Sequence, residues 1–163
     1  MIIVNKNGEL YYKNQIYKCA LGKNGISENK KEGDGCTPAG TFSLGSLYFR
    51  RDRINNIDSN FKAIPIKSNM FWSDHSPSKY YNQLINFRDI SCEQLFKENN
   101  TYDIFLVINY NYNPILKGKG SAIFMHIAKE NLTPTAGCVA LKKNCLINLL
   151  KQLNINDKIK ILL

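Results

Sequence analysis

The chain has 163 residues, of which 44% are hydrophobic and 21% are charged, and its formal net charge is +9. This balance is typical of a globular protein with one domain, 1–163, and no apolar stretch approaches the ~20 residues that a membrane span requires. The positive charge would attract polyanions, but the lysines and arginines are scattered along the chain, so we expect no nucleic-acid partner.

The first part of the chain predicts several short strands. Residues 1–20 follow a strand–turn–strand–turn–strand pattern, and Asn7-Gly8 is a strong hairpin signal because both residues readily adopt positive φ angles. Residues 22–40 contain five glycines and many polar side chains, which predicts a long loop with a functional role or high mobility. Residues 41–50 resume the alternation and predict another strand.

The middle of the chain alternates between turn-rich segments and strands. Residues 61–68 predict a short strand at a sheet edge or bend, because they contain a proline. Residues 70–87 are rich in aromatic and turn residues and predict a loop that lines a cleft. Residues 91–100 predict the start of a short helix, with Ser91 as N-cap and Gln94 as its capping partner.

The last third predicts the centre of the sheet and one helix. Residues 103–113 are the best strand pattern, and residues 118–128 follow after a proline and a glycine-rich turn, which favours an antiparallel neighbour. Residues 142–155 carry leucines at helical spacing, and residues 157–163 predict a final strand. The expected architecture is mainly β (α+β), a sandwich or barrel-like sheet with a C-terminal helix and a short additional helix.

The five cysteines do not form a pattern of pairs. Their number is odd and no Cys-x-x-Cys occurs, which argues against a disulfide framework and a zinc ribbon. Cys138, His126 and Cys145 would offer only three candidate metal ligands, so we expect no metal and no cofactor.

The segment FMHIAKENLTPTAGCVAL, residues 124–141, brings together the parts of a thiol nucleophile. An apolar run delivers His126, a polar loop follows, and Cys138 comes at the end of that loop. Pairing with an imidazole can lower the pKa of a thiol by several units, and the imidazole can then return the proton to a leaving amine. Gly137 allows a tight turn beside the thiol, where backbone N–H groups could hold an oxyanion.

Simpler interpretations of these residues stay open. A cysteine followed by apolar residues is often a packing residue, and a histidine at the end of an apolar strand can be a satisfied core side chain. His75 is a rival base, although it lies in a turn-rich stretch. Asp34 can cap its own turn or contact a substrate.

The pattern of histidine, loop and Thr-x-Gly-Cys-Val resembles the L,D-transpeptidase catalytic domain family, the YkuD-like family. The segments EGDGCTPAGTF, FWSD, KYYN, YDIFLVINYN and GSAIFMHIA are also similar to members of that family, so the resemblance covers nearly the whole chain. It implies a mainly β fold that cross-links peptidoglycan stem peptides. The cysteine of the family attacks the carbonyl of the third residue of a tetrapeptide stem and releases D-alanine, and an amine or water then resolves the acyl-enzyme.

The resemblance assigns roles to residues of this chain. Cys138 matches the nucleophile, His126 its acid–base partner, Gly137 the motif glycine and Thr135 the Ser/Thr position. The third position of the triad in the family is often a backbone carbonyl close after the histidine, which Ile127 could supply. Two residues depart from the pattern: Ala136 replaces a frequent histidine and Ala140 a frequent arginine, which leaves the recognition of a substrate carboxylate open.

The aromatic and polar cluster in residues 72–82 is a candidate groove wall. Its alternative is a surface loop packed on the sheet. The candidate substrate contacts in this cluster are Trp72, Asp74, Tyr81 and Asn82.

Three functions are compatible with these residues. The first is a peptidoglycan L,D-transpeptidase, the second an L,D-carboxypeptidase that uses water, and the third a wall-binding module without catalysis. The substrate implies the cell envelope or periplasm, whereas the opening MIIVNKNGELYY carries no signal-peptide pattern and favours the cytoplasm. The sequence does not give the oligomeric state.

Overall fold

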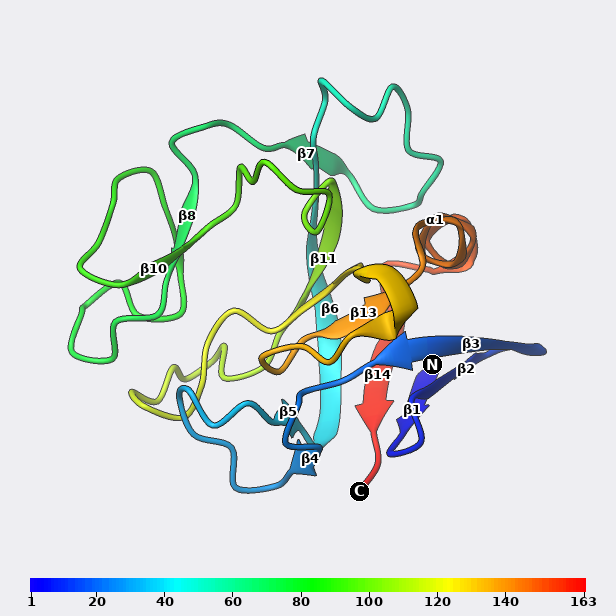
Figure 1. Ribbon diagram of the computed structural model, residues 1–163, viewed down its shortest axis with the longest axis horizontal. Helices are drawn as coiled ribbons and strands as arrows, with labels where there is room; N and C mark the ends of the chain where they lie inside the picture. Colours follow the sequence, from blue (N-terminus) through cyan, green and yellow to red (C-terminus); the bar gives the residue numbers. More distant parts are fainter.

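The computed structural model describes residues 1–163 and is built mainly from β-strands (Figure 1). A nine-stranded sheet forms its centre, and an extra pairing between β11 and β6 makes this sheet barrel-like. In sheet order, the strands are β11 (Ile104–Ile108), β12 (Phe124–Ile127), β13 (Val139–Leu141), β3 (Gln15–Ala20), β2 (Glu9–Tyr12), β1 (Ile2–Asn5), β14 (Lys158–Ile161), β6 (Gly40–Phe49) and β7 (Ala63–Pro65). The mainly β prediction is confirmed.

The N-terminal strands form the predicted hairpins. β1 pairs with β2 in antiparallel register with Asn5 opposite Glu9, and β2 pairs with β3. Gly8 has a φ of 71°, the left-handed conformation that the Asn-Gly pair predicted. The final strand β14 then lies between β1 and β6, and β7 forms the sheet edge at which its proline was expected.

The strands that carry the candidate site lie side by side. β11 and β12 are antiparallel, as the sequence predicted, and β12 and β13 are parallel with Met125 opposite Val139 and His126 opposite Ala140. Because side chains alternate along a strand, this register puts Phe124 and His126 on one face together with Ala140. Met125 and Val139 point to the other face.

The larger apolar core lies on the Met125 face. Met125, Val139 and Leu141 are fully buried there against leucines of helix α1 (Lys143–Gln152), which follows β13 directly. Leu146, Leu149 and Leu150 supply the buried stripe of the helix, as their spacing predicted. Figure 1 shows α1 on the opposite side of the molecule from β8 and β10.

A second, three-stranded sheet lies on the opposite side of the molecule from α1 (Figure 1). It consists of β10 (Cys92–Gln94), β8 (Phe71–Ser73) and β9 (Leu84–Ile85) in that order. The helix predicted from Ser91 is therefore wrong: the segment pairs with β8, where the partner strand satisfies its backbone groups and Leu95 is fully buried. The prediction of a loop over residues 70–87 missed two short strands for the same reason, since pairing between distant segments decides both.

Two smaller elements complete the fold. β4 (Ile26–Ser27) and β5 (Thr37–Pro38) pair in parallel inside the predicted glycine-rich loop. The additional helical element is a 3₁₀ turn, Glu130–Leu132, in the connection from β12 to β13. None of the helices has the length and apolar character that a membrane crossing requires.

Candidate active site

Cys138 and His126 both line one cavity of about 220 Å³. Cys138 precedes β13 by one residue, so its side chain lies on the same face as Ala140, and His126 reaches that face from the neighbouring strand. Both side chains are at least nine-tenths buried. The parallel pair of strands therefore brings together the two residues that the sequence singled out.

The Cys138 thiol is a neutral group in the resting site. Its Sγ accepts a hydrogen bond from the Phe124 N–H at 3.3 Å and donates one to the Ala122 carbonyl at 3.3 Å. Burial raises the pKa of the thiol to about 12, although the Phe124 N–H acts in the opposite direction. A nucleophilic role of this thiol would therefore require a neighbouring base that takes its proton.

The geometry of His126 fits such a base. Its Nδ1 lies 2.9 Å from the carbonyl oxygen of Ile127, which can only accept a hydrogen bond, so Nδ1 carries the proton of the neutral ring. Nε2 is left with a free lone pair. Burial lowers the pKa of His126 to about 4, and the ring packs edge-on against Tyr102 with a centroid distance of 5.4 Å.

Gly137 and Thr135 fix the backbone in front of the thiol. Gly137 has a φ of 147°, and a Cβ at this position would lie 2.7 Å from the carbonyl oxygen of Cys36. The Thr135 hydroxyl donates to the Cys138 carbonyl at 2.7 Å and accepts from the Gly137 N–H at 3.1 Å. The turn therefore requires glycine at position 137, and the two hydrogen bonds of the hydroxyl account for threonine at position 135.

A second cavity of about 290 Å³ also borders Cys138. Asp74 lines it, as does Glu93, which also borders the first cavity. The Glu93 carboxylate accepts hydrogen bonds from Tyr102 at 2.9 Å and from Lys97 at 2.7 Å. The thiol thus borders two cavities, both of which also contain the Glu93 carboxylate.

The other three candidates from residues 72–82 line neither cavity; they are Trp72, Tyr81 and Asn82. Trp72 donates to Asn82 at 2.9 Å, and the same Asn82 oxygen accepts from the Ala122 N–H at 3.1 Å. The Tyr81 hydroxyl donates to Glu32 and accepts from the Gly120 N–H. These buried side chains hold the segment whose Ala122 carbonyl meets the thiol.

Sequence reasoning missed Lys30, Glu93 and Tyr102 as neighbours of Cys138. Glu93 lies in the segment predicted as a helix, Tyr102 precedes a strand, and Lys30 belongs to a charged loop, so no local pattern set them apart. Asp34 takes the turn-capping role that the sequence offered as one alternative, since it accepts from the N–H groups of Lys31 and Cys36.

Two further candidates can be placed. His75, the rival base, lines neither of the two cavities that meet at Cys138. All five cysteines are free thiols, and no group of three or more His, Cys, Asp or Glu side chains is arranged to hold a metal ion.

Comparison with known proteins identifies the family of the chain. The family model described as YkuD, L,D-transpeptidase catalytic domain, matches residues 1–161. Among solved structures, the chain is similar to the helical cell shape determining protein Pgp2 from Campylobacter jejuni, with 16% identity and a TM-score of 0.45. The match covers 98% of this chain but only 46% of Pgp2. No curated protein matches the chain.

Proposed function

Because the chain belongs to the L,D-transpeptidase catalytic domain family, which acts on the cell wall, we propose that it is a peptidoglycan L,D-transpeptidase with Cys138 as nucleophile. The observation that carries this proposal is the shared cavity of Cys138 and His126, in which Nε2 of the histidine has a free lone pair. A neutral imidazole beside a neutral thiol is the resting state from which a base can take the thiol proton.

The reaction follows from these two groups. His126 accepts the thiol proton, and the sulfur attacks the carbonyl of the third stem residue. The C–N bond to D-alanine breaks, and the imidazolium returns the proton to the leaving amine. An amine of a second stem then attacks the thioester, His126 takes the amine proton, and that proton returns to the sulfur as the thiol leaves.

The neighbouring groups have supporting roles in this proposal. The Ile127 carbonyl fixes the tautomer of His126, and Gly137 lets the backbone turn close to the Cys36 carbonyl just before Cys138. Thr135 and Asp74 border the cavities and are the proposed substrate contacts. We propose that the protein acts in the cell envelope, where a peptidoglycan substrate lies.

The L,D-carboxypeptidase alternative uses the same residues with water as acceptor. Two cavities that meet at the thiol favour the transpeptidase, since a second stem needs room beside the acyl-enzyme. A wall-binding module without catalysis would have no use for the free lone pair of His126.

Incubation with muropeptides that carry tetrapeptide stems tests the proposal. The wild-type protein should release D-alanine and form cross-linked dimers, which mass spectrometry separates from hydrolysed tripeptide. Cys138→Ala should abolish both products. Cys145→Ala removes a thiol from helix α1 and should keep them, so an active Cys138→Ala variant would refute the assignment.

Acylation can be followed directly on the intact protein. A carbapenem should add its mass to the wild type and to Cys145→Ala, but not to Cys138→Ala. Saturable binding of muropeptides without any adduct or product would support the binding module instead.

A further inference from the structure

Lys30 lies buried directly beside the backbone that carries the nucleophile. Its side chain is only 4% exposed, yet it borders the second cavity together with Cys138. A Cβ at Gly120 would lie 3.0 Å from Lys30 Cε, and a Cβ at Gly137 would lie 3.5 Å from its Nζ. The two glycines therefore leave the space through which the lysine reaches the site.

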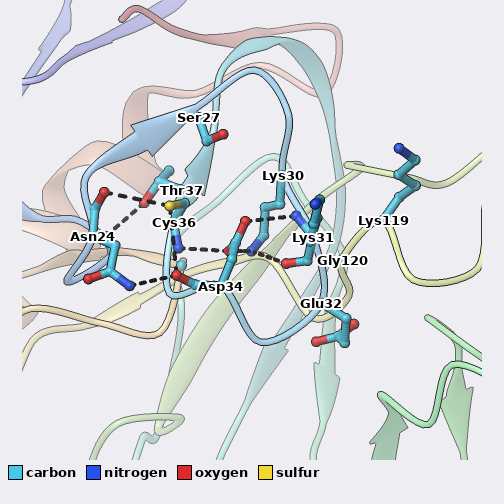
Figure 2. A network of polar contacts seen from close by, with 12 residues as sticks. Asn24, Ser27, Lys30, Lys31, Glu32, Asp34, Cys36, Thr37, Lys119 and Gly120 are labelled. Atoms are coloured by element: carbon cyan, nitrogen blue, oxygen red, sulfur yellow. Dashed lines mark hydrogen bonds and ion pairs between the residues drawn. The ribbon is translucent and has the colours of Figure 1, made fainter.

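The loop holds this ammonium in place. Nζ donates to Asp34 Oδ1 at 2.6 Å and to the Lys31 carbonyl at 3.3 Å, so both contacts meet at the ammonium, and Figure 2 shows Lys30 beside the Asp34 carboxylate. Asp34 also accepts from two backbone N–H groups of its own loop. An ammonium has three N–H donors, so Lys30 has one donor left after these two bonds.

Lys23 also lines this cavity but is exposed, and the acidic side chains of the cavity already accept hydrogen bonds. Glu32 accepts hydrogen bonds from Tyr81 and Ser121, and Asp74 accepts one from Ser91. The two cations of the first cavity are less buried than Lys30: Lys97 is half-buried and pairs with Glu93, and Lys129 is exposed. Lys30 is thus the buried cation that keeps a free donor next to Gly137 and Cys138.

We propose that Lys30 binds the terminal carboxylate of the residue that leaves the donor stem. This inference rests on the proposed transpeptidase function and adds the group that recognises its donor. In the leaving residue, only the amide nitrogen and one Cα separate the carboxylate from the scissile carbonyl. Lys30 lies beside Gly137, the residue before the nucleophile, and is therefore within reach of that carboxylate. A hydrogen bond between an ammonium and a carboxylate is charge-assisted and is stronger than one between neutral groups.

The test compares two donors, a tetrapeptide muropeptide with a free terminal carboxylate and the same compound with a terminal carboxamide. The wild type should use the carboxylate with a kcat/KM at least about tenfold higher, the effect of losing one hydrogen bond between charged groups. Lys30→Met should use both donors equally. Lys31→Met removes the same charge from the same loop at an exposed position and should keep the wild-type preference.

The ratio of the two donors is measured within each protein, so a partly unfolded variant does not distort it. Lys30→Gln retains an N–H donor for Asp34 without the charge, and it should also lose the preference if Lys30→Met does not fold. Equal use of both donors by the wild type would overturn the inference, as would an unchanged preference in either Lys30 variant. Failure of the proposed function looks different, because the wild type would then turn over neither donor.

Discussion

The two faces of β12 and β13 carry different chemistry on the same few residues. Met125, Val139 and Leu141 are completely buried in the apolar core under helix α1. On the opposite face, His126 and Cys138 border a shared cavity, and burial lowers the pKa of the imidazole and raises the pKa of the thiol, so that both groups are neutral. A shift of register by one residue would exchange the two sets, so the core face is what fixes the position of the site face.

The comparison separates the energetic roles of the faces. Buried apolar side chains on the core face stabilise the fold through area removed from water and close packing. Buried titratable groups on the site face cost stability whenever they become charged. Variants of the site face should therefore lose far more activity than folded protein, whereas variants of the core face should lose mainly stability.

The largest expected effect comes from removing the base on the site face. His126→Ala should lower the rate of D-alanine release by about a thousandfold or more, because general-base catalysis and activation of the thiol are lost together. Because the imidazole is buried against Tyr102, the change should also lower the free energy of unfolding in urea by about 1–3 kcal/mol, so the rate is expressed per folded molecule. A variant that releases D-alanine at the wild-type rate would show that another group takes the thiol proton.

On the core face, the neighbouring residue should show the opposite behaviour. Met125→Ala removes a fully buried side chain and should lower the free energy of unfolding by about 2–5 kcal/mol. Activity per folded molecule at 25 °C should stay near the wild-type value, since the side chain points away from the cavity. Urea denaturation and active-site titration with a carbapenem measure the two quantities, and a loss of activity greater than the loss of folded protein would contradict the separation.

The sequence predicted the parts of the molecule that depend on local patterns. The alternation before His126, the Asn-Gly turn and the helical spacing of Leu146, Leu149 and Leu150 each encode an element by themselves. The strand at Cys92–Gln94 was wrongly predicted as a helix, because its conformation depends on pairing with β8, about twenty residues earlier in the chain.

The site divides in the same way. Cys138 and His126 are close in sequence and were identified from their spacing and the family resemblance. Trp72, Tyr81 and Asn82 were chosen as a groove wall from their composition, but composition does not reveal which side chains the fold buries. Lys30 and Glu93 lie far from Cys138 in the chain and reach it through loops, so only the tertiary structure brings them together.

The smallest expected effect is a pH dependence of stability that belongs to the site face. Burial lowers the pKa of His126 from 6.5 to about 4. Above pH 6.5 the histidine is neutral in both the folded and the unfolded chain, and no stability is lost. Below that pH the unfolded chain binds a proton that the buried ring does not, so the folded state becomes less stable as the pH falls toward 4.

This loss should reach about 2 kcal/mol between pH 7 and pH 5 in urea denaturation of the wild type, since one pKa unit corresponds to about 1.4 kcal/mol. Glu9, whose pKa is lowered from 4.5 to about 2, contributes its loss only below pH 4.5, outside this range. His126→Gln should remove most of the dependence between pH 7 and pH 5, whereas Met125→Ala should keep it on a lower baseline. An unchanged slope in His126→Gln would mean that the buried ring is not the source, and the contrast between the two faces would then rest on activity alone.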